Sequence, residues 1–485
     1  MSKQNPHTVC IIGGGMSGLI TGALLAKNGY KVTILEKNHI IGGGLQSFRR
    51  GDAVFNTGMQ VFCGYEKPFM LGYLFNYLNI FPQSVHIIPT DSSAQEIIWT
   101  DSGHCYRLPK SRDKYEKYLI TCFPHEKNGI VTLMDDIYMI GKTFDYSILQ
   151  KRKNHPEAIP YYLMSARELI QKHISDNELI NLFEYIGMHS GYNLSNIPAI
   201  DICLLLNLYI EGSWRIAGGN FSLAQALANV ITSYGGKILN NAHVHKVHVQ
   251  DKKIMYVETK SGERYISDIF ISSVAPKLLL KMVDGEIFRT STKHRVDAFK
   301  NDSSGCLLSI RLKPQCIKYQ PHLFFFPAQK KDKTLPLYIS LLTPARTEQD
   351  EWADTMEVLA FNHYENFNKW ENSFVGQRGD EYELYKQEIA NRLIDYVSQY
   401  YPTIKDAVDT VFVATPLTLR DYYGNIDGAV YAQQGVFIPI RTKANNLFIT
   451  GQAVQYQGLF GVATTSIIVA ETILGKSLIE EIAKA

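Results

Sequence analysis

The sequence predicts an α/β fold in which a parallel-sheet domain is assembled from three segments of the chain and an α+β domain from the two segments between them. Two observations predict the first domain: a glycine-rich turn follows the first apolar run, and a strand–glycine–helix pattern recurs over residues 445–475. The second domain is predicted because the two long middle segments lack any such glycine pattern. A chain of 485 residues also exceeds what one core accommodates, so two or more domains are expected.

The composition describes an ordinary folded protein and argues against several classes. Hydrophobic residues make up 45% and charged residues 20%. Lys plus Arg total 49 and Asp plus Glu 47, and a net charge of +2 gives no electrostatic case for a nucleic-acid partner. Seven scattered Cys without a Cys-x-x-Cys pair indicate a reducing compartment. No signal peptide or transmembrane run is recognised, so we expect a cytoplasmic protein, with peripheral contact to the inner face of a membrane left open.

The amino-terminal stretch Val9–Lys37 predicts a unit that binds a dinucleotide. The apolar run Val9–Ile12 reads as a buried parallel strand, and Gly13, Gly15 and Gly18 follow it with G-x-G-x-x-G spacing. The first glycine permits a tight turn, the second lets the backbone approach a pyrophosphate, and the third lets helix and strand pack closely. The alternative is a glycine-rich turn in some other α/β protein.

A helix and a second strand complete this unit. The helix would direct its amino-terminal N–H groups at the phosphates, and we place Met16 and Ser17 there. The second strand leads to Glu36 and Lys37, and Glu36 lies 23 residues after Gly13, a spacing at which a carboxylate accepts hydrogen bonds from a ribose diol. Because this carboxylate would repel a 2′-phosphate, NADP is disfavoured, and the unit reads as a Rossmann-like domain. Its elements are expected at residues 9–12, 17–28 and 31–35.

Gly43, Gly44 and Leu45 lie in a second glycine cluster directly after the acidic residue. This cluster resembles the glycine pair that follows the nucleotide-binding unit in large flavoproteins of the amine oxidase and phytoene desaturase kind. It would bring another stretch of backbone to the phosphates or the flavin. Those flavoproteins usually have Arg after the glycine pair, and Gly44-Leu45 replaces it here.

The stretch Asn445–Gly475 resembles the carboxyl-terminal part of the same flavoproteins and favours FAD over NAD. It reads as a strand, a turn at Gly451 and Gln452, and a helix from about Val462, with Gly461 just before it. In the flavoproteins it resembles, the strand–glycine segment meets the ribityl chain, and the helix directs its amino terminus at the N1/C2=O edge of the flavin, where its dipole would stabilise reduced flavin. Gln452 stands where many relatives have Asp. The alternative is a glycine-capped helix without a ligand.

Three patches resemble the phytoene desaturase superfamily and, within it, the branch of carotenoid isomerase and retinol saturase: Phe55–Gly64, Ala414–Gln434 and Thr450–Val462. In the first patch Asn56 and Gln60 replace the family's Asp and His, so any chemical role of that His is absent or altered here. The resemblance implies FAD as the cofactor, a Rossmann-like FAD-binding domain of the GR2 or amine oxidase type, and an interleaved α+β substrate domain built on a mixed sheet and helices. On the same resemblance, the backbone of Val244 would meet the adenine.

The middle of the chain supplies the rest of the domain plan. Leu223, Leu227 and Ile231 form one apolar helix face. The apolar stretch Ile200–Trp214 reads as a core helix, with the lining of an apolar substrate tunnel or a face directed at the surface as alternatives. Lys151–Lys153 is a solvated basic run that could also rest on anionic lipid. The FAD-binding domain is placed in residues 1–75, 215–290 and 405–485, and the substrate domain in residues 76–214 and 291–404.

A metal site is not expected. On a strand, His243 and His245 share one face while His248 falls on the other, so three convergent ligands would need distortion.

The expected function is a FAD-dependent oxidoreductase acting on C–C or C=C bonds of an apolar isoprenoid or polyene, by hydride transfer at flavin N5. Neither a Ser/His/Asp nor a paired-carboxylate constellation is recognised, and no catalytic acid or base is assigned. No second dinucleotide fingerprint exists for a nicotinamide, so electrons would pass through an external donor or acceptor, unless the flavin cycles without net redox change.

Two alternatives stay open: a flavin amine oxidase-like enzyme, and a non-redox flavoprotein that binds lipid. Expected near the flavin face, or else packed around the cofactor, are Gln60, Tyr423, Tyr431, Tyr456 and Phe460.

Overall fold

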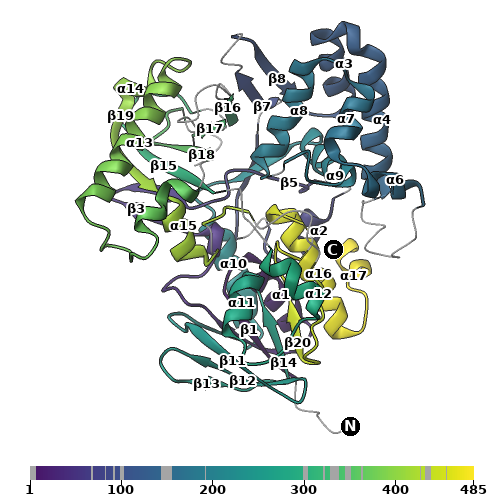
Figure 1. Cartoon of the computed structure of the whole chain (residues 1–485), viewed down its shortest axis with the longest axis vertical. Helices are drawn as coiled ribbons and strands as arrows, with labels where there is room; N and C mark the ends of the chain where they lie inside the picture. Colours follow the sequence, from purple (N-terminus) through teal and green to yellow (C-terminus); the bar gives the residue numbers. More distant parts are fainter. Residues whose placement is uncertain are drawn as a thin grey trace.

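The computed structural model describes the chain except for residues 1–6, 67–68, 82–83, 91–92, 99–102, 144–155, 192, 299–303, 320–322, 328–337, 344–350, 362–363, 426–427, 432–437 and 455. In Figure 1 a parallel sheet lies below, a large mixed sheet at the upper left, and a group of helices at the upper right. The basic run at residues 151–153 lies outside the described residues.

The parallel sheet joins strands from the beginning, middle and end of the chain. Its order is β10 (Lys237–Leu239), β2 (Lys31–Leu35), β1 (Thr8–Ile12), β14 (Ile269–Ser272) and β20 (Leu447–Ile449), with all neighbours parallel. Apolar side chains on both faces explain why the strands read as continuous hydrophobic runs. Strands β1 and β2 lie within one residue of the predicted ranges 9–12 and 31–35.

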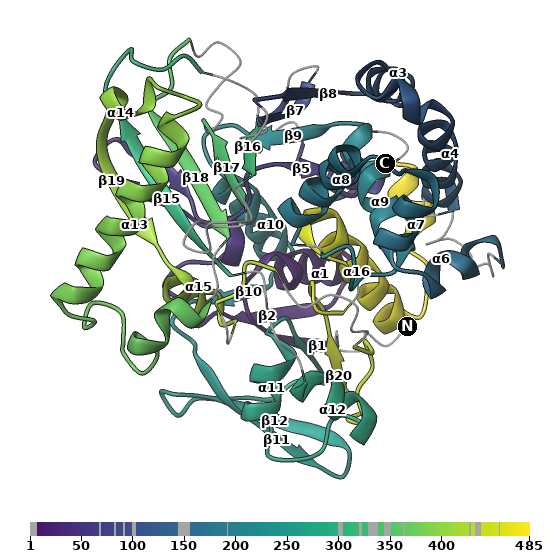
Figure 2. The ribbon, with the colours of Figure 1, turned by 45° about the horizontal axis from the view of Figure 1, so that its top comes forward.

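The two faces of this sheet are covered differently. Val9 and Ile11 point to helices α1 (Met16–Lys27), α10 (Phe221–Ser233) and α16 (Gly458–Leu474). Figure 2 shows α1 and α16 side by side on this face. Cys10 and Ile12 point to the other face, which α11 (Pro276–Met282), α12 (Thr290–Asp297) and a small antiparallel sheet cover. That sheet is made of β11 (Val244–Gln250), β12 (Lys253–Thr259) and β13 (Arg264–Tyr265).

Helix α16 begins at Gly458, earlier than the predicted start near Val462. Two glycines in its first turn made this stretch read as a loop. The helix nevertheless forms there because Leu459 is buried in the core of the parallel-sheet domain. Tertiary packing therefore outweighs the low helix propensity of glycine.

The mixed sheet is assembled from two distant parts of the chain. Its order is β19 (Val408–Ala414), β15 (Gly305–Leu312), β18 (Thr355–Phe361), β17 (Tyr338–Leu342), β16 (Leu323–Pro327), β7 (Ser93–Ile98) and β8 (Cys105–Pro109). Only the β16–β7 pair is parallel among these described neighbours, and it joins the two parts. This interleaving confirms the predicted fold class, whereas the four boundaries between the five predicted domain segments stay a prediction.

Helices cover both faces of the mixed sheet. Leu308 and Val358 pack against α13 (Asp380–Ser398) and α14 (Ile404–Ala407). On the opposite face, Leu307 and Leu359 pack into a helical group. This group consists of α3 (Arg112–Cys122), α4 (Lys127–Thr143), α6 (Ile159–Leu163), α7 (Ala166–His173), α8 (Asn177–His189) and α9 (Ala199–Ile210).

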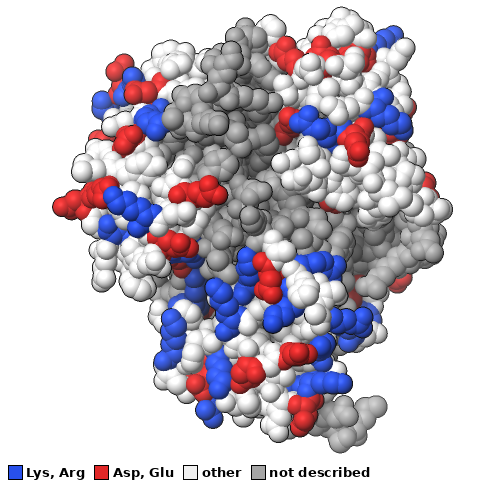
Figure 3. Space-filling view, in the orientation of Figure 1, with Lys and Arg blue, Asp and Glu red and all other residues white. Residues whose placement is uncertain are grey.

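Shorter elements complete the described part of the fold. They are the hairpin β3 (Ser47–Arg50) and β4 (Ala53–Asn56), the sheet of β5 (Phe62–Cys63), β9 (Ser213–Ile216) and β6 (Ile87–Pro89), and helices α2 (Met70–Tyr77), α15 (Pro416–Tyr423) and α17 (Ile479–Ala483). Among the described helices, none combines the length and apolarity needed to cross a bilayer. On the face drawn in Figure 3, Lys and Arg gather over the lower part, interspersed with Asp and Glu.

Candidate active site

A cavity of about 480 Å³ lies where the parallel sheet meets the helical group. The loops after four parallel strands line one end of it, through Gly13 after β1, Glu36 after β2, Ser273 after β14 and Gly451 after β20. The carboxyl edge of a parallel sheet is the usual position for a nucleotide site. The other end of the cavity is lined by residues of α9.

The first glycine loop leaves the amino terminus of α1 open to the cavity. Gly13 has a φ of +101°, which favours glycine, and a Cβ at Gly15 would have no heavy atom within 4 Å. Among the described residues no side chain caps α1 at Gly15, so the N–H groups of Met16 and Ser17 are available to a ligand. Gly18 does not line the cavity; a Cβ there would lie 2.2 Å from the Gly13 carbonyl oxygen. Its lack of a side chain lets the helix pack on the loop.

Glu36 places a buried carboxylate beside this loop. The residue is 5% exposed; its Oε2 accepts a hydrogen bond from the Gly14 N–H at 2.7 Å, and its Oε1 accepts one from Asn38 at 2.8 Å. A carboxylate has about four acceptor positions, so capacity remains for ligand hydroxyls. Lys37, the next residue, lies in the same wall, and burial lowers the pKa of its ammonium group.

The second glycine loop packs directly on the first. Gly42 donates to the Gly14 carbonyl at 2.8 Å, and a Cβ at Gly43 would lie 3.2 Å from the Gly15 Cα. Gly44 and Leu45 continue this wall of the cavity. A side chain at Gly43 would push the two loops apart, whereas one at Gly42 would meet Ala224, so both glycines have a steric cause.

The amino terminus of α16 also faces the cavity. Among the described residues no side chain caps this helix at Gln457, and Gly461 and Val462 of its first turns line the cavity. Gly461 is sterically required, because a Cβ there would lie 2.4 Å from the Tyr456 carbonyl carbon. Gln452 lines the cavity just after β20. Two helix amino termini therefore meet one cavity, an arrangement suited to negative charge.

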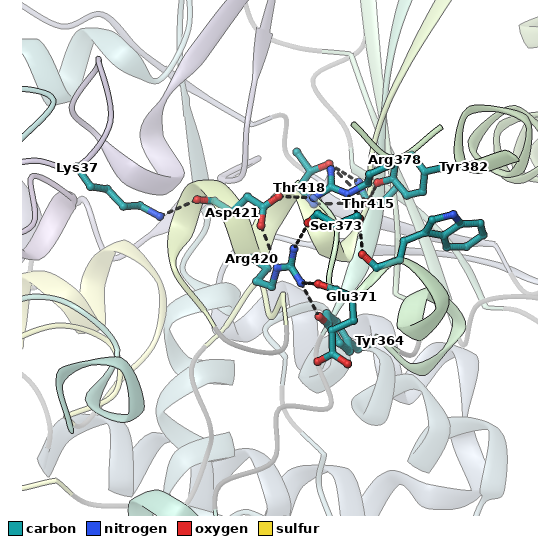
Figure 4. Close-up of polar contacts among 11 residues, drawn as sticks. Lys37, Tyr364, Glu371, Ser373, Arg378, Tyr382, Thr415, Thr418, Arg420 and Asp421 are labelled. Carbon is teal, nitrogen blue, oxygen red and sulfur yellow. Dashed lines mark hydrogen bonds and ion pairs between the residues drawn. The ribbon is translucent and has the colours of Figure 1, made fainter. Parts of the chain in front are cut away.

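Helix α15 holds Tyr423 in the cavity wall. Polar contacts on two sides fix this helix in place (Figure 4). Lys37 Nζ donates to the Asp421 carbonyl oxygen at 2.6 Å. On the other side, Arg378 pairs with the Asp421 carboxylate, and Arg420 donates to Tyr364 and to backbone carbonyls near η4 (Tyr364–Trp370). These contacts tie the end of β2 to the mixed-sheet domain.

The two departures within the Phe55–Gly64 patch, Asn56 and Gln60, lie in different surroundings. Asn56 is structural: its N–H donates to Glu357 at 2.9 Å, and its Oδ1 accepts from the Asn220 N–H at 2.9 Å. Gln60 lines the cavity and is 8% exposed; its Oε1 accepts from Ser340 Oγ at 3.0 Å, while its Nε2 has no partner among the described residues. Gln60 therefore places beside the cavity a buried amide nitrogen that has no partner among the described residues.

The far end of the cavity is mainly apolar. Leu204, Leu205 and Leu208 of α9 line it, while the opposite face of α9 packs into the core. Helix α9 therefore packs into the core with one face and lines the cavity with another, which are two of the three roles that the sequence left open. Leu208 and Phe460 both lie beside Gly64, at the junction with the glycine loops, because a Cβ at Gly64 would lie 3.0 Å from Leu208 and 2.6 Å from Phe460.

The predicted residues come together in this cavity, with the single exception of Gly18, and their individual roles stay predictions. Cavity-lining residues among them are Gly13, Gly15, Met16, Ser17, Glu36, Lys37, Gly43, Gly44, Leu45, Gln60, Val244, Tyr423, Tyr431, Gly451, Gln452, Tyr456, Phe460, Gly461 and Val462. Sequence reasoning missed Asp201, Asn207, His243 and Ser273. The position of Ser273 after a buried strand, and the two polar residues within apolar α9, were available as signals.

The three histidines do not converge. His243 lines the cavity, and burial together with nearby Lys260 lowers its pKa. His248 Nδ1 lies 2.6 Å from an Asp284 carboxylate oxygen, whereas His245 lies 4.0 Å from Glu258. Within the described part of the chain, no group of three or more His, Cys, Asp or Glu is placed to hold a metal ion.

Comparisons with known proteins agree with this geometry. Residues 11–78 match the family described as NAD(P)-binding Rossmann-like domain. The chain is 22% identical to an all-trans-retinol 13,14-reductase of Danio rerio, over 96% of this chain and 86% of that protein. It is 24% identical to prolycopene isomerase 1 of an Oncidium hybrid cultivar, over 99% of this chain and 86% of the isomerase. Putrescine oxidase bound to putrescine matches with a TM-score of 0.66 at 15% identity, over 97% of this chain and 100% of that one.

These findings confirm two predictions. The Rossmann-like domain lies where the first glycine motif placed it. The resemblance to the branch of carotenoid isomerase and retinol saturase extends over nearly the whole chain. The likeness to putrescine oxidase concerns the fold and agrees with the amine oxidase type predicted for it.

Proposed function

We propose that the protein is a FAD-dependent oxidoreductase, because the chain is similar over nearly its whole length to a retinol reductase and a prolycopene isomerase. Its substrate is an apolar isoprenoid or polyene-type molecule, and the reaction is desaturation, saturation or isomerisation at a C–C or C=C bond. One observation carries the proposal: the loops of a dinucleotide site and an apolar wall line the same cavity.

The residues present fit FAD. The open amino terminus of α1 suits the pyrophosphate, and Glu36 suits the ribose of the adenosine half. The backbone at Gly44 and Gly451, with Gln452, would hold the ribityl chain, and α16 would direct its positive end at the flavin. Val244 keeps its proposed contact with the adenine. When bound, the flavin supplies a donor or acceptor of hydride at N5.

The chain's own contribution is alignment and exclusion of water. Leu204, Leu205 and Leu208 give an apolar substrate a wall along α9, and Phe460 stands where that wall meets the glycine loops. Burial raises the pKa of Tyr423 and of Tyr431 to about 12, so near neutral pH both phenols stay neutral. An external donor or acceptor carries electrons wherever the reaction has net redox change.

A mass measurement tests this function. Oxidised and reduced holoprotein are incubated with defined polyenes and with a cellular lipid extract, and the products are examined by mass spectrometry and chromatography. A two-hydrogen shift identifies desaturation or saturation, and a changed retention time at constant mass identifies isomerisation. Protein that takes up no FAD, or that changes none of these substrates in either redox form, contradicts the proposal.

The fold likeness to putrescine oxidase supports a second candidate, an enzyme of the flavin amine oxidase kind. Release of hydrogen peroxide on a panel of amines, without polyene turnover, would favour it. A holoprotein inactive in both assays that still binds lipid would favour a non-redox flavoprotein.

A cytoplasmic location with peripheral contact to a membrane belongs to the main proposal, because an apolar substrate partitions into lipid. Cosedimentation with liposomes tests that contact.

A further inference from the structure

We propose that Asp201 determines substrate specificity at the far end of the cavity, where its carboxylate accepts a hydrogen bond from a terminal O–H or N–H group of an otherwise apolar substrate. This inference rests on the proposed function and adds to it the chemistry of the substrate's end. Asp201 is partly buried and lines the cavity.

The position of Asp201 follows from the geometry of α9. Asp201, Leu204, Leu205 and Leu208 are spaced as i, i+3, i+4 and i+7, so they lie along one side of the helix, and all four line the cavity. Leu208 and Phe460 both lie beside Gly64 at the junction with the glycine loops. Seven residues of helix advance about 10 Å at 1.5 Å per residue. A substrate that begins at the junction and follows the leucines therefore ends at the carboxylate.

The carboxylate of Asp201 differs from other buried acids of this chain in having no hydrogen-bond donor among the described residues. Glu126 accepts hydrogen bonds from Ser175 and Asp176, and Glu36 accepts two from the backbone. Burial, with no compensating cation, raises the pKa of Asp201 to about 6. A carboxylate withdrawn from water without a partner is costly, and a ligand donor would offset that cost.

The position of Asp201 in the first turn of α9 gives a weaker explanation. An acid there favours the helix dipole, but the effect does not require the side chain to face a cavity. Asp113 occupies the first turn of α3 with an exposed side chain, and it does not line the cavity. Asp113 therefore provides the matched control for removal of a first-turn acid.

A binding series with altered termini tests the inference. The probes are all-trans-retinol, its methyl ether and all-trans-retinylamine, and their affinity for the holoprotein is measured by quenching of tryptophan fluorescence. Wild type should bind the alcohol about tenfold to a hundredfold more tightly than the ether, the range expected for a hydrogen bond to a charged group. Asp201→Leu should bring the two affinities within about twofold of each other.

A conservative variant separates hydrogen bonding from charge. Asp201→Asn keeps an acceptor oxygen, so it should retain part of the preference for the alcohol over the ether while losing affinity for the amine. Asp113→Asn should leave all three affinities unchanged. The inference is overturned if wild type does not prefer the alcohol, if Asp201→Leu keeps that preference, or if none of the probes binds.

Failure of the inference is distinguishable from failure of the proposed function. Bound FAD and product formation from polyenes are read from absorbance and mass, and neither depends on the alcohol-to-ether ratio. Holoprotein that turns over polyenes with a ratio insensitive to Asp201 overturns the specificity role alone. Loss of FAD binding or of turnover in wild type overturns the function itself.

Discussion

The phenol of Tyr423 donates a hydrogen bond to the backbone carbonyl of Thr57, a residue 366 positions earlier in the chain. This contact holds the loop of Thr57 and Gly58 against Gly44, because a Cβ at Gly58 would lie 2.7 Å from the phenol oxygen and 2.9 Å from the Gly44 carbonyl oxygen. The bond therefore joins the second glycine loop to α15 in one wall of the cavity.

Removal of this hydroxyl tests its contribution. Tyr423→Phe leaves the Thr57 carbonyl without its donor, and we expect the free energy of unfolding to fall by about 1–2 kcal/mol. Tyr422→Phe is the matched control, because the neighbouring ring is 39% exposed and should change stability by less than about 0.5 kcal/mol. Urea unfolding of the holoproteins measures both. Equal effects of the two substitutions would show that the Tyr423–Thr57 bond does not contribute.

Gly15 and Gly18 should respond in opposite ways to an added side chain. A Cβ at Gly15 meets nothing within 4 Å, so Gly15→Val should fold normally and lose FAD, because the side chain takes the ligand's space. A Cβ at Gly18 would lie 2.2 Å from a backbone oxygen, so Gly18→Ala should lower the free energy of unfolding by about 1–3 kcal/mol. Flavin absorbance and thermal unfolding of each apoprotein separate the two effects. Yellow Gly15→Val protein with full FAD content would contradict the assigned position of the pyrophosphate.

The nucleotide-binding half of the molecule was predictable because its constraints are local. Gly13 and Gly18 are sterically required by the chain itself, Gly15 leaves space for a ligand, and Glu36 follows at a fixed distance along one βαβ unit. The apolar runs also placed β1 and β2 to within one residue. The start of α16 was wrong because burial of Leu459, a tertiary effect, decides it.

The substrate end was less predictable because it depends on packing between distant segments. The apolar pattern of α9 shows that the helix is buried, but not that Leu204 and Leu208 face a cavity rather than the core. The pairing of β7 with β16 likewise joins segments about 230 residues apart, and no local signal encodes it. Asp201 was passed over because a single acid in the first turn of a helix has an ordinary explanation.

Gln60 should affect ligand affinity as well as stability. Gln60→Leu leaves the buried Ser340 hydroxyl without its acceptor, at a cost of about 1–2 kcal/mol, and it also removes an amide nitrogen that has no partner among the described residues. We expect unchanged FAD content and a KM for a polyene substrate raised by about fivefold to tenfold, corresponding to one lost hydrogen bond of about 1 kcal/mol. Ser340→Ala is the control, because it removes the same internal bond and leaves the amide in the cavity. A KM raised equally by both substitutions would assign the effect to the internal bond.

The buried carboxyl of Glu357 should make stability depend on pH. Burial raises its pKa from 4.5 to about 7, although the Asn56 N–H and the charge of Arg215 act in the opposite direction. The native state therefore binds this proton more tightly than the unfolded chain, so the stabilisation is complete below pH 4.5 and is lost as the pH rises through about 7. Asp201, whose pKa is also raised, contributes with the same sign.

Substitution of Glu357 isolates this contribution, because that of Asp201 is common to both proteins and cancels in their difference. The excess stability of wild type over Glu357→Gln should fall by about 3 kcal/mol as the pH rises from below 4.5 to above 7. Denaturant unfolding at a series of pH values measures it, and Glu351→Gln serves as the control substitution at an exposed position. A constant difference for Glu357→Gln would mean that this carboxyl has the same pKa in the folded and unfolded chain. The Asn56 and Arg215 contacts would then fully offset its burial.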